Sequence, residues 1–305
     1  MTPCFNEESG IAECYTRVRE VIATRLPEYD YEHLFIDNCS TDKTVEILRD
    51  IAASDKNVRV IVNSRNFGLG RSPFHGMIHV RGDAIVPILA DLQTPPEAIP
   101  EFVTRWNQGF KIVAAIRKDV RQSWPKRLMR AVFYKIFEKL SDIEFIPHFF
   151  GFGLYDRKVI EVMRALNEPD PYFRGLVSEI GFQKTIVEYI EPPRKHGESR
   201  HNFMDLLDLA ILGMTTYSRA PLRLLTIVSV AVAALSFLTG LVYLVLKLLY
   251  WQQFEAGIAP ILIGALFFVA IQMLAIGLVG EYVGLVLIYA RRFPTVIEKE
   301  RIGFD

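Results

Sequence analysis

Two long runs without a charged side chain constrain the fold of this chain more than any other feature. Residues 224–246 form one run of 23 residues, and residues 256–280 form another of 25 residues. At about 1.5 Å per helical residue, each run reaches roughly 35 Å, which is enough to cross a hydrocarbon core of about 30 Å. A soluble domain seldom buries two helices that are so long and that contain no charged residue. The chain is therefore predicted to carry two membrane-spanning helices.

Basic residues beside these runs predict the orientation of the spans. Arg219 and Arg223 precede the first run, whereas the connecting loop, about residues 247–257, has a single Lys and a single Glu. The positive-inside rule then places the long N-terminal region and the C-terminal tail in the cytoplasm. The basic residues that follow the second run are Arg291, Arg292, Lys299 and Arg301.

The length and net charge of the chain limit what the rest of the molecule can be. The 305 residues leave room for a sizeable soluble domain before the spans. Lys and Arg together number 35, as do Asp and Glu, so the zero formal charge argues against nucleic acid as a partner. Cys4, Cys14 and Cys39 show neither metal spacing nor an even framework, as expected of reduced cytosolic thiols.

Apolar and amphipathic stretches alternate along the first part of the chain. This alternation predicts an α/β domain with a doubly wound, largely parallel sheet. Strands are expected at residues 31–36, 58–62, 84–90 and 111–116, and helices at 11–26, about 42–53, about 69–80 and about 96–108.

The first strand of such a sheet is expected to be missing or reduced to a stub. Met1 stands only two residues before the loop that contains Asn6 and Glu7. A doubly wound sheet ordinarily places its first strand centrally, where its backbone groups need ladder partners. About five further apolar residues before Met1 would supply that strand.

The acidic turn after residues 84–90 is the expected centre of the domain. Asp91 follows this apolar run directly, Gln93 comes two residues later, and Pro95 and Pro96 then suit a helix start. Ligands of open α/β sheets bind beyond the carboxyl ends of the strands. Since Asp37 ends another predicted strand, both carboxylates are expected at one crevice, although a single Asp at a strand end is more often a turn residue.

After Arg117 the chain becomes basic. Residues 117–139 hold eight Lys or Arg against two acids, a net charge of +6, with aromatic and aliphatic side chains between them. This pattern is typical of a helix on an anionic membrane surface and equally of an amphipathic helix packed on the sheet. Because two spans follow, a basic interface helix is expected at about residues 122–140. A second amphipathic stretch, residues 203–217, leads into the first span.

Three motifs taken together resemble the family-2 glycosyltransferases of GT-A fold. They are PCFNEE (3–8), DNCSTD (37–42) and ADLQTPPE (90–97). The RNFG run (65–68), the R-K-x-G-E-S-R run (194–200) and the two spans narrow the resemblance to the polyprenyl-phosphate glycosyltransferases. That group includes the dolichyl-phosphate mannose synthases and bacterial undecaprenyl-phosphate glucosyltransferases. The resemblance covers nearly the whole chain.

The resemblance implies a division of the chain into four parts. A cytoplasmic GT-A domain, Rossmann-like with a doubly wound, mostly parallel sheet, occupies residues 1–195. An amphipathic juxtamembrane segment follows at 196–221, then a two-helix transmembrane domain at 222–290 and a cytoplasmic tail at 291–305. The implied location is the inner (plasma) membrane, and relatives suggest a homo-oligomer formed through the spans.

The implied activity is inverting transfer of a sugar at the cytoplasmic leaflet. The donor would be a UDP- or GDP-linked sugar, and the acceptor undecaprenyl or dolichyl phosphate. A lipid phosphate has a second pKa of roughly 6, so it is mostly a dianion at pH 7. Such a nucleophile needs positioning and a stabilised leaving group more than a general base. Two alternatives stay open, another lipid acceptor and a catalytically silent, membrane-tethered nucleotide-sugar binder or scaffold.

The resemblance also implies the residues of the site. A nucleotide diphosphate calls for Mg²⁺ or Mn²⁺, which take oxygen ligands, and Asp91 and the Gln93 carbonyl match the family's metal positions. Arg117 and Arg200 are candidates for neutralising the diphosphate. Glu179 is a further candidate carboxylate, although a surface charge is its commoner role. The matching nucleoside-binding positions are Pro3, Asn6, Glu7, Asp37 and Asn66.

Several positions depart from the pattern of the family. Leu89 stands where many relatives have Asp, Asn38 and Cys39 stand where Asp-Gly is usual, and Gly151 replaces an Asp near the reacting centre. These departures leave open whether activity is reduced. The sugar, the nucleotide and the oligomeric state do not follow from the sequence. No zinc site is expected, because no ligand spacing with a matched partner links His75, His79, His148, His196 and His201.

Overall fold

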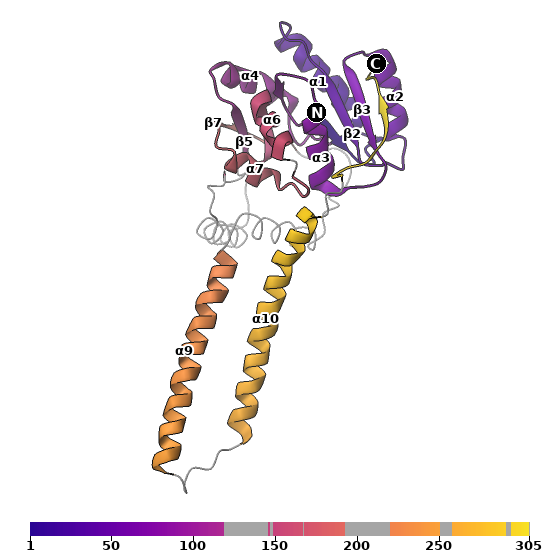
Figure 1. The fold of residues 1–305 in the computed structure, drawn as a ribbon. Coiled ribbons are helices and arrows are strands. Elements are labelled where there is room, and N and C mark those ends of the chain that lie inside the picture. Colours follow the sequence, from indigo (N-terminus) through magenta and orange to yellow (C-terminus); the bar gives the residue numbers. More distant parts are fainter. Residues whose placement is uncertain are drawn as a thin grey trace. The chain divides into compact units, whose positions relative to one another are not determined.

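The computed structural model describes residues 1–118, 146, 149–166, 168–192, 220–250, 258–290 and 294–304 (Figure 1). The chain divides into two compact units. The first comprises Met1–Lys135, Ile143–Leu209 and Arg292–Asp305, and the second comprises Ile136–Asp142 and Ala210–Arg291. The described strands all belong to the first unit, and the two long helices belong to the second.

Four strands form a sheet in the order β1-β2-β3-β8. The strands β1 (Thr2–Cys4), β2 (His33–Asp37) and β3 (Val58–Asn63) run parallel to one another. The first strand, expected to be missing or reduced to a stub, is present as a three-residue strand, and each of its residues pairs with β2. The last strand, β8 (Glu298–Ile302), lies antiparallel to β3 along the edge, as the yellow arrow in Figure 1 shows.

A second sheet has the order β4-β6-β5-β7. The strands are β4 (Ala84–Ile85), β5 (Ile112–Arg117), β6 (Phe149–Asp156) and β7 (Lys184–Tyr189). β5 and β7 are parallel, whereas β6 is antiparallel to both β4 and β5. Consequently β4, β5 and β7 share one direction.

Met1 connects the two sheets. The strand predicted at residues 84–90 has ladder pairing only over its first two residues. Beyond them, the Met1 amino group donates to the Val86 carbonyl at 3.0 Å and the Ile88 N–H donates to the Met1 carbonyl at 2.8 Å. Because one residue is bonded to both neighbours of its partner, this is parallel pairing. The segment that ends at Asp91 therefore runs in the same direction as β1, β2 and β3.

Helices cover both faces of this assembly. The described helices of the first unit are α1 (Ile11–Arg25), α2 (Thr44–Ser54), α3 (Gly68–His79), η1 (Pro96–Ala98) with α4 (Ile99–Asn107), α6 (Arg157–Leu166) and α7 (Phe173–Glu179). Alternate residues of β3 take part in different clusters, Val60 and Val62 with Leu48 of α2, and Ile61 with Phe74 of α3. The α/β class with helices on both faces is confirmed, and β6 and β8 make its sheets mixed.

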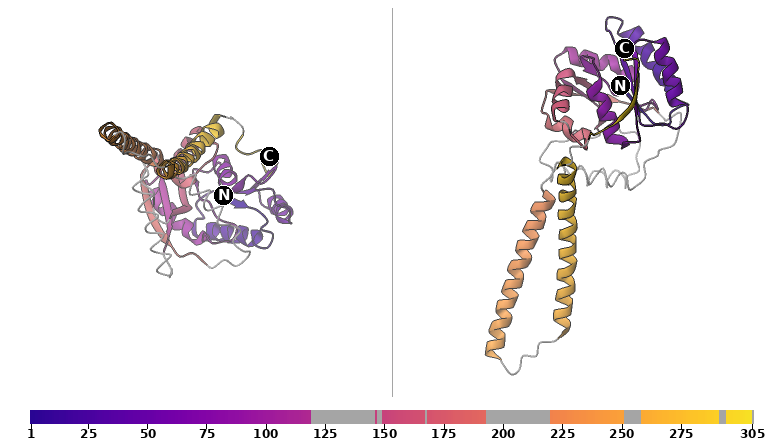
Figure 2. Two further views of the ribbon diagram at one scale, coloured as in Figure 1. Left: turned by 90° about the horizontal axis from the view of Figure 1, so that it is seen from below. Right: turned by 45° about the vertical axis from the view of Figure 1, so that its right-hand side comes forward.

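The second unit contains two long apolar helices, α9 (Ala220–Leu249) and α10 (Ile258–Ala290) (Figures 1 and 2). Their segments Leu224–Val242 and Phe267–Ala290 have mean hydropathies of 2.3 and 2.0, and no residue in the scored windows is buried. Exposed apolar side chains over such a length suit a lipid environment. Both predicted spans are thus present as helices of sufficient length and composition. The basic segment at 122–140, the stretch at 203–217 and Arg200 lie outside the described residues.

Candidate active site

The loop after β1 is hydrogen-bonded to the loop after β2. Asn6 has a positive φ of 54°, and its N–H donates to Ser40 Oγ at 2.8 Å. The Asn6 Oδ1 atom accepts the N–H of Thr41 at 2.8 Å. The Glu7 N–H donates to Thr44 Oγ1 at 2.8 Å. The structure thus brings the predicted residues Asn6 and Glu7 to the carboxyl end of β2.

Asp37 is buried at that strand end, opposite Cys4 of β1 in the parallel register. Its carboxylate accepts the Ser40 N–H at 2.8 Å and the Ser40 hydroxyl at 2.5 Å. Burial raises the pKa of Asp37, while the two donors from Ser40 act in the opposite direction. Each carboxylate oxygen has further lone pairs, so the group can also accept hydrogen bonds from a ligand.

The Asn38 side chain ties together the segments that follow β2 and β3. Its Nδ2 donates to Asn66 Oδ1 at 2.9 Å and to the Gly68 carbonyl at 3.2 Å. Its Oδ1 accepts the Asn63 amide at 3.2 Å and the Phe67 N–H at 2.9 Å. A carboxylate could not donate the first two bonds. The departure from Asp at this position thus has a structural reason, and it fixes Asn66 beside the site.

Asp91 begins a tight turn beside these loops. Leu92 has a φ of 58°, and Asp91 Oδ1 accepts the Gln93 N–H at 3.1 Å. The preceding residue, Ala90, is buried in the same cluster as Cys4 and Phe35. Asp91 therefore lies next to the ends of β1 and β2, as expected of parallel strands that end at one edge.

Cys14 of α1 lies close to two of the predicted carboxylates. Its Sγ atom is 3.9 Å from the Leu89 carbonyl oxygen. Burial raises the pKa of the Cys14 thiol to about 12, and the charges of Asp91 and Glu7 add to this effect. Asp91 and Glu7 thus both lie within electrostatic range of the Cys14 thiol.

Arg117 ends β5 and forms an ion pair with Glu191, which follows β7. Its guanidinium carbon lies 5.6 Å from the centre of the Phe150 ring, and that of Arg174 lies 4.4 Å from the same centre. The Phe150 side chain is half exposed. Two cations therefore flank an exposed aromatic ring, and the Arg117 charge is already balanced by one carboxylate.

The positions of Gly151 and Glu179 bear on the missing Asp. Gly151 has a φ of 94°, and a Cβ atom there would lie 3.2 Å from the Phe173 ring. The backbone at residue 151 thus favours glycine over any L side chain. Glu179 is the last residue of α7.

A cavity of about 530 Å³ lies away from this edge, where α3 ends and the chain enters β4. Arg157 donates to the Val80 carbonyl at 2.8 Å, and Arg164 donates to the Ile78 carbonyl. These guanidinium groups satisfy carbonyls at a helix end, which is a structural role. The cavity is lined by Ile78, His79, Val80, Arg81, Arg157 and Arg164.

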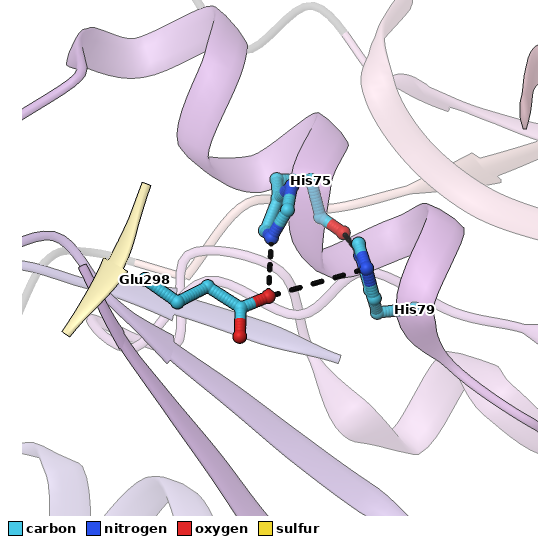
Figure 3. Close-up of side chains that lie close together, drawn as sticks. All are labelled: His75, His79 and Glu298. Carbon is cyan, nitrogen blue, oxygen red and sulfur yellow. Dashed lines mark hydrogen bonds and ion pairs between the residues drawn. The ribbon is translucent and has the colours of Figure 1, made fainter. Parts of the chain in front are cut away.

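A cluster of side chains that could hold a metal ion has no signal in the sequence (Figure 3). His75 and His79 of α3 have a matched acidic partner after all, Glu298 of β8. This residue is 223 positions from His75 along the chain, so no local spacing could reveal it. The expectation that these histidines lack a partner was therefore wrong.

Comparison with known proteins gives a consistent result. Residues 1–164 match the profile described as glycosyl transferase family 2. The chain is 36% identical over 306 residues to the uncharacterized glycosyltransferase YkcC of Bacillus subtilis (strain 168), covering 100% of this chain and 94% of the relative. It is 35% identical over 302 residues to the bactoprenol glucosyl transferase of Shigella phage SfV, covering 98% and 97%. The solved structure of S. aureus TarS 1–349 in complex with UDP-GlcNAc is 16% identical, with a TM-score of 0.41 over 71% of this chain and 66% of that one.

Proposed function

The chain belongs to glycosyl transferase family 2, and from this premise we propose that it transfers a sugar from a nucleotide diphosphate to a polyprenyl phosphate. The observation that carries the proposal is the similarity to bactoprenol glucosyl transferases over 98% of the chain. That similarity includes the strand-end loops and the two apolar helices together. Transfer proceeds with inversion at the cytoplasmic leaflet of the inner (plasma) membrane.

The linked loops after β1, β2 and β3 form the nucleoside side of the proposed site. Asn6 and Glu7 are held by Ser40, Thr41 and Thr44, so their backbone is fixed before a donor arrives. Such preorganisation lowers the entropy cost of binding. The nucleoside is proposed to contact Pro3, Asn6, Glu7, Asp37 and Asn66.

Asp91 and the Gln93 carbonyl are proposed to hold Mg²⁺ or Mn²⁺. The donor set fits, because both ions prefer oxygen ligands and use few protein carboxylates when phosphates and waters complete the shell. The bond from the Gln93 N–H orients the Asp91 carboxylate in its turn. The bound ion would supply positive charge for the diphosphate leaving group.

The remaining residues of the proposed site would neutralise the charge of the diphosphate and position the sugar. An oxygen of the acceptor phosphate forms the new bond to the anomeric carbon, while the bond to the diphosphate oxygen breaks and its electron pair leaves with the nucleotide. Because the acceptor is already a dianion, this step needs no general base. Arg117 and Arg200 are proposed to bind the diphosphate, with Arg117 exchanging Glu191 for it. Glu179 remains a candidate for positioning the sugar.

The path of the chain indicates that the parts before α9 and after α10 lie on the same side of the membrane. The chain leaves the first unit before α9 and re-enters it as β8, which pairs with β3. Two crossings return a chain to the side on which it started. The basic residues beside the spans support the cytoplasm as that side. Assembly into a homo-oligomer through α9 and α10 is also proposed, since their apolar side chains are exposed within the unit.

Donor and acceptor dependence tests this function. Purified full-length protein is incubated with radiolabelled UDP- and GDP-sugars, with or without undecaprenyl phosphate and Mg²⁺. Label is expected in the lipid fraction only when donor, acceptor and metal are all present. Donor binding without transfer would instead favour the silent binder that Leu89 and Gly151 suggest. Transfer to a different lipid would refute the proposed acceptor.

A further inference from the structure

His75, His79 and Glu298 form a cluster that the proposed transfer does not use (Figure 3). The two histidines lie one turn apart on α3, with ring centroids 4.1 Å apart. His75 Nε2 is 2.7 Å from Glu298 Oε1, and His79 Nε2 is 4.0 Å from the same oxygen. One ligand atom from each residue lies within 4.8 Å of the others.

A β-bulge directs Glu298 toward α3. Val62 pairs with Glu300 and the next residue, Asn63, pairs with Glu298, so the register shifts at this point. Residues two apart in a regular strand face the same side, but a bulge re-aims one of them. Glu300 accordingly pairs with Arg49 of α2, on the opposite face of the sheet from α3.

We propose that His75, His79 and Glu298 bind a divalent transition-metal ion, best matched by Zn²⁺, which fastens β8 to α3. Zinc takes imidazole nitrogen at about 2.0–2.1 Å and carboxylate oxygen at about 2.0–2.2 Å, so tetrahedral ligands stand about 3.3 Å apart. The separations of 2.7 and 4.0 Å lie on either side of that value.

The hydrogen bond on the far side of the His79 ring favours metal binding. His79 Nδ1 is 2.8 Å from the His75 carbonyl oxygen. Because a carbonyl only accepts, Nδ1 carries the proton and Nε2 presents its lone pair toward Glu298. Metal-binding histidines commonly donate their other N–H to a carbonyl in this way. The ring of His75, whose Nε2 now donates to Glu298, takes its other tautomer when the ion binds.

Glu298 offers a carboxylate ligand that the ion can reach. Arg301 donates to Oε2 at 2.5 Å and to Oε1 at 2.7 Å, so it can keep Oε2 while Oε1 turns to the metal. The side chains of His75, His79 and Glu298 are 12%, 29% and 20% exposed, which leaves access for the ion and a water as fourth ligand.

Metal binding to the full-length protein tests this proposal. Zn²⁺ is titrated by calorimetry in excess Mg²⁺, which occupies oxygen-ligand sites, with wild type, His79→Gln, Glu298→Gln and Glu300→Gln. Glu300→Gln is the matched control, because it removes a carboxylate from the same strand on the opposite face. Wild type and Glu300→Gln are expected to bind one Zn²⁺ per chain and to melt at a higher temperature with it. His79→Gln and Glu298→Gln should bind at least about 10-fold more weakly.

Two results would overturn the site. One is Zn²⁺ binding that His79→Gln and Glu298→Gln leave unchanged, and the other is an equal loss in Glu300→Gln. The metal-free melting temperature of each variant shows whether it has folded. If Glu298→Gln does not fold, His79→Gln, at the most exposed of the three positions, decides the outcome alone.

Discussion

Asn38 is the residue whose departure from the family pattern the structure explains most fully. Replacing it by Asp removes the donors to Asn66 and Gly68 and sets a carboxylate against their oxygens. Asn38→Asp is expected to lower the free energy of unfolding by about 1–3 kcal/mol, since buried groups lose their partners. Denaturant unfolding measures the loss. Asn57→Asp should lose less, because residue 57 is exposed and its new carboxylate can accept a hydrogen bond from the neighbouring Tyr31 hydroxyl. An equal loss in both variants would contradict the predicted role of Asn38.

His33 gives the protein a predicted pH dependence. It is buried, with Nε2 2.8 Å from Thr2 Oγ1, and burial lowers its pKa well below 6.5. Below about pH 6.5 the unfolded chain takes up a proton that the folded ring does not, so stability falls as the pH falls. Above that pH both states are neutral and His33 contributes no slope. Melting temperatures from pH 8 to pH 5 should show this decline, and His33→Gln should make it shallower. Part of the decline should remain, because burial also lowers the pKa of His75 and of the Met1 amino group. An unchanged slope in the variant would contradict the predicted role of His33.

At the scale of elements, β6 depends on a glycine at close approach to β5. Gly153 has a φ of 155°, and a Cβ there would lie 2.1 Å from the Val113 carbonyl oxygen. Gly153→Ala is expected to destabilise the first unit by about 3 kcal/mol. Gly109 also has a positive φ but nothing within 4 Å of a Cβ, so Gly109→Ala should cost only about 1–2 kcal/mol. Equal losses of unfolding free energy would show that the contact with Val113 is unimportant.

The elements before Arg117 were predictable, and several after it were not. Regular periodicity and turn residues located α1, α2, β3 and β5 to within a few residues. β8 was not predicted, because its sequence, Glu-Lys-Glu-Arg-Ile, is charged and lacks the apolar pattern of a buried strand. Edge strands often carry such charges. Pairing with a distant β3 leaves no local pattern. The sequence pattern correctly placed Asp37 at the end of a strand and Asp91 in a turn. The hydrogen bonds of Asn38 and the cluster at Glu298 join residues far apart in the sequence, so only the fold reveals them.

At the scale of the whole molecule, the return of the chain as β8 predicts the membrane topology. The segment between α9 and α10 should face the outside, whereas Cys39, in a site loop, should face the cytoplasm. In intact cells, an impermeant maleimide is expected to label Gln252→Cys placed in a Cys39→Ser background. Wild-type Cys39 should react only after permeabilisation. Labelling of Cys39 in intact cells would show that the orientation is the opposite of the proposed one.

Asp91 is proposed to organise metal-dependent transfer of a sugar to a lipid phosphate. The most direct measurement is the rate at which radiolabelled sugar enters undecaprenyl phosphate, with Mg²⁺, for wild type, Asp91→Asn and Asp83→Asn. Asp83 is an exposed residue just before β4, so its variant is a matched control. Asp91→Asn is expected to fall about 100-fold or more with an unchanged melting temperature, because the metal contributes several kcal/mol to stabilising the leaving group. Asp83→Asn should match wild type, and normal turnover by Asp91→Asn would contradict the account.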